Sequence, residues 1–153
     1  MLNIASYVDH GVRGSNWTIN DYISEYTSMA NSIVSGILNP QALVGPSVCC
    51  QVQGFQLTDV FNAGFLNTSN SLAVVTVQHY PNNNCAINGQ TVTGQQIFPD
   101  YLSHTNVQAL VELYKDDVAA TIAAGKELVM LEMNTASCGG FPGLSDSFGA
   151  AMW

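Results

Sequence analysis

Hydrophobic positions along the chain show two different patterns. One is a spacing typical of helices, and the other is a continuous run typical of buried strands. Residues 17–38 carry apolar side chains at a spacing of three to four residues, which predicts an amphipathic helix. Residues 72–78 form a β-branched, apolar run, which predicts a strand covered on both faces. Residues 127–133, which are mostly apolar and follow Gly125, predict another strand.

The clearest predicted helix spans residues 106–124. Thr105 and Gln108 form a candidate capping box at its start, and Gly125 is suited to its C-cap. The apolar stripe of this helix consists of Val107, Leu110, Val111, Tyr114, Val118 and Ile122. This spacing predicts one continuous helix.

Helices and strands are predicted to alternate along the whole chain. The expected elements are a helix at 17–38, a strand at 42–49, a short helix at 57–66, a strand at 72–78, an Asn/Gly/Gln-rich loop to about residue 99, a helix at 106–124, a strand at 127–133 and a short helix from residue 145. This order implies parallel strands joined by right-handed crossovers. A complete (β/α)8 barrel takes about 250 residues. We therefore expect an α/β fold that is a partial (β/α)8 barrel with about three parallel strands, in which strands 42–49 and 128–133 are the sheet edges.

One acidic residue interrupts the last predicted strand. Residues 128–133 are apolar except for Glu132, which stands near the carboxyl end. Burying an unpaired carboxylate is costly, and catalytic groups of (β/α) barrels lie at the carboxyl ends of the strands. Glu132 is therefore the candidate catalytic residue. The alternatives are an outward-facing residue on an edge strand or a member of a buried ion pair.

Two neighbouring segments extend this candidate site. His79 and Tyr80 follow the preceding strand, and a hydrogen bond from either side chain would orient the carboxylate of Glu132. Alternatively, they are aromatic residues lining a loop. Residues 134–143 are Gly-rich and contain no Arg or Lys, so an anion would be held there by amides and hydroxyls. Alternatively, this segment is an ordinary flexible loop.

Composition restricts the classes of partner. The chain has 3 basic and 11 acidic residues among 153, a net charge of −8, and three cations cannot neutralise a phosphate track or anchor a membrane surface. No apolar run reaches the about 18 residues that a membrane span needs, and residues 1–15 contain no apolar signal-peptide core. The 9% charged content and the glycosylation acceptors at Asn16 and Asn67 favour a secreted protein. We expect neither nucleic acid nor membrane as a partner.

Four cysteines allow three complete pairings: Cys49, Cys50, Cys85 and Cys138. On a strand, the adjacent pair Cys49 and Cys50 would point to opposite faces. Zinc binding is disfavoured because the chain contains neither a Cys-x-x-Cys nor a His-x-x-x-His spacing. One disulfide, with Cys85 and Cys138 as the favoured pair, is expected over a metal site, and free buried thiols are the alternative. We expect no metal and no cofactor.

The segment around the acidic residue resembles a known enzyme family. The run EMNTASCGGFPGLSDSFGA, residues 132–150, looks like the nucleophile strand and loop of glycoside hydrolase family 79, the fungal β-glucuronidase-like enzymes and relatives of heparanase. Residues 9–13 and 16–38 resemble the segment that follows the acid/base strand of that family. The resemblance implies an extracellular (β/α)8-barrel enzyme that hydrolyses a terminal uronic acid, or a related sugar, with retention.

The same resemblance implies roles for individual residues. Glu132 is the expected nucleophile, and Tyr80 or His79 corresponds to the aromatic group that contacts it. The loop at residues 137–140 is expected to receive the carboxylate of the sugar. The expected substrate-binding residues are His79, Tyr80, Asn134, Ser137, Gly139 and Gly140. The expected partner is therefore a carbohydrate.

One motif of the family has no counterpart in this sequence. The family has Asn-Glu-Pro just before the region that matches residues 9–11, whereas this chain contains no Asn-Glu-Pro. Glu25 and Glu112 fall on predicted helices, and Glu127 lies at the opposite end of the strand from Glu132. We therefore expect residues 1–153 to be a partial catalytic domain, approximately barrel strands five to seven, that carries the nucleophile without the acid/base and is inactive alone.

Two other hypotheses stand beside a partial enzyme. The chain could be a diverged, non-catalytic sugar-binding or interaction protein that kept the loop without the acid. It could also be a small domain, stabilised by a disulfide or a metal, in which Glu132 is structural.

Overall fold

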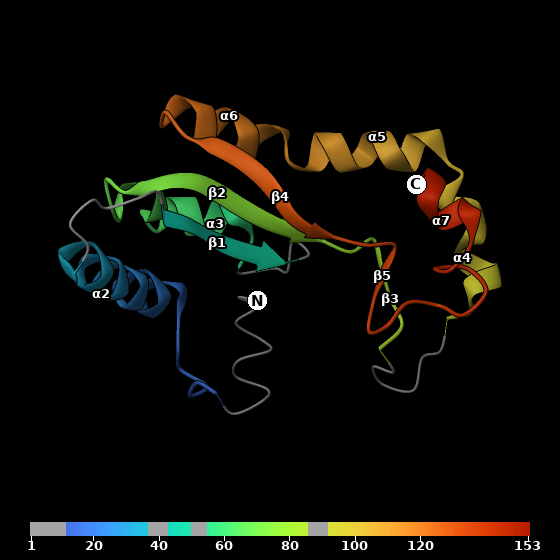
Figure 1. Ribbon diagram of the computed structural model, residues 1–153, viewed down its shortest axis with the longest axis horizontal. Coiled ribbons are helices and arrows are strands. Elements are labelled where there is room, and N and C mark those ends of the chain that lie inside the picture. Colours follow the sequence, from blue (N-terminus) through green and yellow to red (C-terminus); the bar gives the residue numbers. More distant parts are fainter. Residues whose placement is uncertain (1–11, 37–42, 50–54, 86–91) are drawn as a thin grey trace. The chain divides into compact units, whose positions relative to one another are not determined.

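The computed structural model describes residues 12–36, 43–49, 55–85 and 92–153. Its elements, in chain order, are α2 (Ile19–Gly36), β1 (Leu43–Cys49), α3 (Leu57–Asn62), the 3-10 helix η1 (Phe65–Asn67), β2 (Leu72–His79), β3 (Asn82–Asn83), α4 (Gly94–Tyr101), α5 (His104–Leu113), α6 (Lys115–Ala123), β4 (Glu127–Met133), β5 (Ala136–Ser137) and α7 (Phe148–Met152) (Figure 1). The chain forms two compact units, and each is described by itself. Residues 1–78 and 117–132 form the first unit, and residues 79–116 and 133–153 form the second.

A small parallel sheet organises the first unit, and its strand order is β1-β2-β4. The prediction of parallel strands is confirmed, as is the prediction that the first and third strands are edges of this sheet. Pro46 lies opposite Thr76, and Val48 lies opposite Val77, so Ser47 is an extra residue in β1. Such a β-bulge interrupts the pairing and re-aims the local side chains. The structure is thus a mixed α/β fold with a small parallel sheet.

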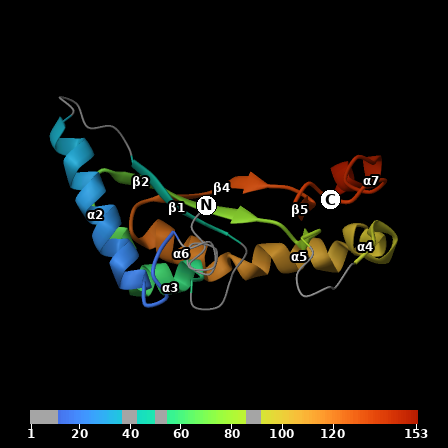
Figure 2. The ribbon, with the colours of Figure 1, turned by 90° about the horizontal axis from the view of Figure 1, so that it is seen from below.

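Aromatic rings fill the core of the first unit. The rings of Tyr22 and Tyr26, from α2, lie 6.1 and 4.8 Å from the ring of Phe65 in η1. Phe55 adds an edge-to-face contact at 5.7 Å from Tyr22. A Cβ atom at Gly45 would lie 3.2 Å from the Tyr26 ring, so the glycine lets β1 pack closely under the rings. Figure 2 shows α3 and α6 on the same side of the three strands.

The helix predicted at 106–124 is two helices, so the prediction of one continuous helix is wrong. The break falls at Tyr114, and α5 begins after the N-cap Ser103, whose hydroxyl accepts from the amide of Asn106, rather than at Thr105. In α6 the buried residues are Asp117 and Thr121. Three members of the predicted stripe, Val111, Val118 and Ile122, are exposed, whereas Tyr114 is buried.

The reversed burial of α6 has a tertiary cause. The hydroxyl of Thr58, in α3, donates to the carboxylate of Asp117 at 2.9 Å, and the hydroxyl of Thr121 donates to the backbone carbonyl of Asp117 at 2.7 Å. These hydrogen bonds satisfy polar groups on the inward face of α6. The contact with α3 therefore decides which face of α6 is covered, against the preference of the apolar stripe.

Two boundaries in the first unit depend on glycine. The short helix predicted at 57–66 ends at Asn62, and Gly64, with φ +95°, precedes η1. Gly125, with φ +69°, ends α6: its amide donates to the carbonyl of Ile122, and the amide of Lys126 donates to the carbonyl of Thr121. This pair of hydrogen bonds is a Schellman motif, as expected for a glycine C-cap.

The second unit is built around a short parallel pair, β3 with β5. Its hydrophobic core cluster consists of Ile97, Tyr101, Ala136, Phe141 and Leu144, with Trp153 packed against them. Helix α4 lies within the stretch that was expected to be a loop, so that prediction is wrong there. Thr93 and Gln96 form a capping box at the start of α4. This capping box stabilises a helix that the Gly- and Gln-rich sequence does not predict.

Candidate active site

Glu132 is the penultimate residue of β4, and its position at the carboxyl end of a parallel strand is as predicted. The strand starts directly after the Schellman turn at Gly125. The ammonium group of Lys126 donates to the carbonyl oxygen of Leu72 at 2.5 Å, which fixes the beginning of β4 beside the beginning of β2. The fold therefore sets the register of the strand from its amino end, at Lys126, six residues before Glu132.

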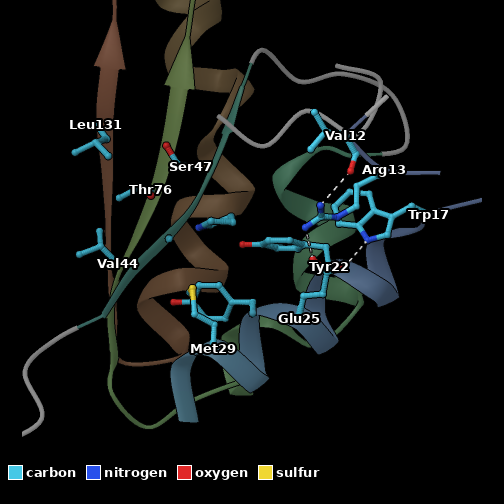
Figure 3. A pocket seen from close by; sticks show the side chains of 13 residues that line it. Val12, Arg13, Trp17, Tyr22, Glu25, Met29, Val44, Ser47, Thr76 and Leu131 are labelled. Carbon is cyan, nitrogen blue, oxygen red and sulfur yellow. Dashed lines mark hydrogen bonds and ion pairs between the residues drawn. The ribbon is translucent and has the colours of Figure 1, made fainter. Parts of the chain in front are cut away.

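The side chain of Glu132 is exposed, so the argument from a buried carboxylate is wrong. The reason is that β4 is a sheet edge. Leu128 packs against the core of the first unit, and side chains alternate along a strand, so Glu132 lies on the same face of β4 as Leu128. Leu131, 59% exposed, lies on the opposite face and lines a cavity (Figure 3).

The three basic residues have other partners. Arg13 forms an ion pair with Glu25 at 2.7 Å, Lys115 forms one with Glu112 at 3.2 Å, and Lys126 binds the Leu72 carbonyl. Within the described part of the chain, no ion pair involves Glu132. Glu132 is thus an exposed residue near the end of an edge strand, and the described residues do not place it in a buried ion pair.

His79, the last residue of β2, binds a tyrosine that sequence reasoning did not single out as a partner. Its Nδ1 atom lies 2.9 Å from the hydroxyl of Tyr114, and the two rings meet edge to face. Burial lowers the pKa of His79 below its ordinary value of 6.5, so the imidazole is neutral at pH 7. Tyr80 is half-buried. The break between α5 and α6 at Tyr114 supplies this partner.

A disulfide and a short strand pair hold the Gly-rich loop. Cys85 and Cys138 are bonded, with their Cα atoms 5.3 Å apart, which confirms the predicted pair. Cys49 is disulfide-bonded as well, so more than one disulfide is present, whereas Cys50 lies outside the described residues. The amide of Asn84 donates to the carbonyl of Ser137 at 3.2 Å, and its side chain donates to the carbonyl of Gly140 at 2.7 Å. A disulfide and two hydrogen bonds thus tie this segment to residues 84–85.

Three consecutive residues of this loop have left-handed backbone: Cys138 at φ +58°, Gly139 at +83° and Gly140 at +76°. A Cβ atom at Gly140 would lie 2.6 Å from the Ser145 Oγ atom, so no larger residue fits without displacement. The Gly140 amide donates to the Ser137 carbonyl, and the Phe141 amide donates to Ser145 Oγ. The loop amides were expected to be available for an anion, but these two have acceptors within the loop.

Asn134 and Tyr101 make the remaining contacts at the base of the loop. The side-chain oxygen of Asn134 accepts a hydrogen bond from the backbone amide of Thr135 at 2.7 Å. The Asn134 side chain is therefore engaged by its neighbour in the chain. The buried Tyr101 hydroxyl donates to the Thr135 carbonyl and accepts from the side chain of Asn82 at 3.2 Å. Sequence reasoning missed Tyr101, Asn84 and Ser145, because only the folded loop brings them to the residues that they bind.

The predicted site residues are divided between the two units of the chain. His79, Tyr80, Asn134 and the 137–140 loop all belong to the second unit. Glu132 belongs to the first. The predicted contact of Glu132 with His79 or Tyr80 therefore stays a prediction. Asp9, His10 and Gly11, which contribute to the family resemblance, lie outside the described residues.

A charged cluster on α2 was not anticipated. The hydrogen bond from Arg13 is the main cause that lowers the pKa of Glu25, and the indole N–H of Trp17 donates to the other carboxylate oxygen at 3.1 Å. The pKa of Asp21 is lowered by hydrogen bonds from the hydroxyl and amide of Thr18. Both carboxylates are thus ionised at neutral pH.

Comparison with protein-family models, with curated proteins and with solved structures finds no match to this chain. No helix among the described residues is long and apolar enough to cross a membrane. The described residues also contain no group of three or more His, Cys, Asp or Glu side chains placed to hold a metal ion.

Proposed function

We propose that this chain is the nucleophile-bearing part of a retaining glycoside hydrolase barrel, similar to glycoside hydrolase family 79, that acts on a terminal uronic acid or a related sugar. One observation carries the proposal: a carboxylate, Glu132, stands at the carboxyl end of a parallel strand. Catalytic groups of (β/α) barrels occur at this position. The resemblance of residues 132–150 to the nucleophile segment of that family agrees with it.

In this proposal Glu132 is the nucleophile. Its carboxylate attacks the anomeric carbon of the sugar, a C1–O ester bond forms, and the leaving group departs with the electron pair of the glycosidic bond. Water then cleaves the ester. The resemblance assigns substrate binding to His79, Tyr80, Asn134, Ser137, Gly139 and Gly140.

The orientation of β4 sets a condition for this role. Glu132 shares a strand face with Leu128, which packs against the core, whereas Leu131 faces the opposite side. A sugar must therefore reach the carboxylate over the carboxyl end of β4, where Glu132 is exposed. A substrate bound on the open face beside Leu131 would not meet it.

Covalent trapping tests the proposal directly. A 2-deoxy-2-fluoro-β-D-glucuronyl fluoride carries a leaving group that needs little protonation, so a nucleophile can attack it without an acid partner. We expect intact-mass spectrometry to show the addition of one fluorosugar with loss of fluoride, and peptide mapping to place it on Glu132. The same assay on p-nitrophenyl β-D-glucuronide should show slow release of p-nitrophenol.

Two carboxylates of the same strand provide a matched comparison. Glu132→Gln should lose the adduct, and Glu127→Gln, at the other end of β4, should keep it. Circular dichroism melts verify that each variant is folded. An adduct that persists in Glu132→Gln, or no adduct on a chain that melts cooperatively, contradicts the proposal.

A further inference from the structure

A cavity in the first unit has a polar floor that the proposed nucleophile does not use. Its volume is about 540 Å³, and it lies between α2 and the edge of β1 (Figure 3). The lining includes Tyr26 and Met29 of α2, residues 44–47 of β1, Thr76 of β2 and Leu131 of β4. A cavity of this size is within the range that proteins use for small molecules.

One polar residue of the cavity lining has a hydroxyl that lacks a partner within the described part of the chain, and a second unpaired polar atom lies near it on β2. Thr76 is 1% exposed, and its hydroxyl has no hydrogen-bond partner among the described residues. Gln78, two residues further on the same face of β2, is 5% exposed, and its side-chain oxygen likewise has no partner in the described ranges. The Gln78 side-chain amide donates to Ser47 Oγ at 3.0 Å. An unpaired buried hydroxyl is costly, so a ligand in the cavity that supplies a hydroxyl would satisfy Thr76.

The walls of the cavity are apolar and aromatic. Met29, Val44 and Leu131 are each about half exposed there, and Tyr26 adds an aromatic ring. The bulge at Ser47, with φ +59°, places a hydroxyl-bearing residue outside the regular pairing of β1 and β2. A ligand that fits must therefore combine hydroxyl groups with an apolar face.

The charged groups of the lining neutralise each other. Arg13 donates to one oxygen of Glu25 at 2.7 Å, and Trp17 donates to the other at 3.1 Å. The guanidinium group of Arg13 also lies 5.5 Å from the centre of the Trp17 ring. Arg13, the cation among the described lining residues, is already engaged by Glu25, so this described lining presents no unpaired charge to hold an anion.

We propose that this cavity is a binding site for an uncharged, hydroxylated ligand with an apolar face, the chemistry of a neutral aryl or alkyl glycoside. The site goes beyond the proposed hydrolysis of a uronic acid. It lies on the strand face of Leu131, opposite the face of Glu132, and its polar lining includes Ser47, whose hydroxyl accepts from Gln78 outside the lining, and Thr76.

Saturation-transfer difference NMR on the full chain tests the site, with phenyl β-D-glucopyranoside as the neutral probe. Phenyl β-D-glucuronide serves as the charged comparison, since it differs only by a carboxylate. We expect binding of the neutral probe in the millimolar range and at least fivefold weaker binding of the glucuronide. Equal binding of both, or no signal from the neutral probe on a chain that melts cooperatively, overturns the proposal.

A variant that removes only the unpaired hydroxyl separates a binding role from a structural one. Thr76→Val keeps the side-chain shape, so its melting temperature should stay unchanged or rise, while the affinity for the neutral probe should fall about tenfold. Thr121→Val is the matched control, because the Thr121 hydroxyl is hydrogen-bonded within α6. It should lower the melting temperature and leave binding unchanged. Unchanged affinity in Thr76→Val contradicts the site.

Two further variants keep the outcome decisive. If Thr76→Val does not fold, Met29→Trp, which fills the cavity from the exposed side of α2, should abolish binding, and retained binding would refute the site. Glu132→Gln should bind the neutral probe normally while losing the covalent adduct. The failure of this site and the failure of the proposed nucleophile are therefore distinguishable.

Discussion

The Nδ1 atom of His79 and the hydroxyl of Tyr114 lie 2.9 Å apart, and this contact joins the end of β2 to the break between α5 and α6. The histidine is half-buried, and burial lowers the pKa of His79 because the charged imidazolium is poorly solvated there. A polar partner at the ring thus holds a neutral histidine in place.

The contact predicts a pH dependence of stability. The pKa of His79 in the folded chain is below the unfolded value of about 6.5, so the unfolded chain binds more protons between the two values. The free energy of unfolding should therefore fall as the pH drops below about 6.5 and should be level above it. Urea unfolding at pH 5.5, 6.5 and 7.5 measures this, and His79→Asn should flatten the part of the slope that the histidine causes.

His104, which is exposed at the start of α5, supplies the control for this series. His104→Gln, which removes an exposed histidine, is measured at the same three pH values. A slope that survives unchanged in His79→Asn would show that other groups cause it.

Removing only the Tyr114 hydroxyl tests the contact itself. Tyr114→Phe keeps the buried ring but leaves His79 without this partner, and the loss of one neutral hydrogen bond should cost about 1 kcal/mol. Denaturant unfolding at pH 7.5 measures the change. Tyr101→Phe removes a different buried hydroxyl of the second unit and should lower stability without altering the pH response of His79.

Periodicity predicted the first unit well because local patterns and packing agree there. The helix at α2 and the strands β1, β2 and β4 follow their apolar spacing closely. The break at Tyr114 and the buried Asp117 could not be predicted, because the apolar stripe continues through both. Thr58 and His79, distant in sequence, decide those positions through hydrogen bonds.

The sequence predicted where Glu132 lies in its strand, but it did not predict which residues surround Glu132 or that it is exposed. A lone carboxylate in an apolar strand located Glu132, but its exposure depends on β4 being an edge, which a single sequence does not determine. The cysteine spacing left three pairings open, and only the fold brings Asn84 to Gly140. The cavity beside β1 could not be predicted from the sequence, because Ser47, Thr76 and Leu131 come from three different strands.

Adjacent glycines allow a matched test of the loop. Gly139→Ala adds a Cβ with nothing within 4 Å, so only its left-handed backbone is penalised, at about 1–2 kcal/mol. Gly140→Ala has the same cost of a left-handed backbone, and it also places the new Cβ atom 2.6 Å from Ser145 Oγ. We expect the second variant to be clearly less stable than the first in thermal melts. Equal losses would mean that Ser145 moves aside without cost.

The disulfide between Cys85 and Cys138 closes a loop of 53 residues in sequence separation. The chain-entropy relation gives a stabilisation of about 4 kcal/mol for a loop of that length. The double variant Cys85→Ser/Cys138→Ser should therefore melt at a lower temperature, with faster hydrogen exchange at the amide of Asn84. Reductant added to this variant reports separately on the disulfide of Cys49.

The open edge of the sheet predicts self-association. The edge strand β4 exposes Val129, Leu131 and Met133, an apolar row on one face of a strand. Unprotected edges of this kind pair with other chains, and a lysine on the edge opposes such pairing. We expect the wild-type chain to associate in a concentration-dependent way during size-exclusion chromatography with light scattering. Leu131→Lys should shift it toward the monomer at an unchanged melting temperature, because Leu131 is already 59% exposed. Val118→Lys, on the exposed face of α6, controls for added charge alone: if it suppresses association equally, the edge of β4 is not the contact surface.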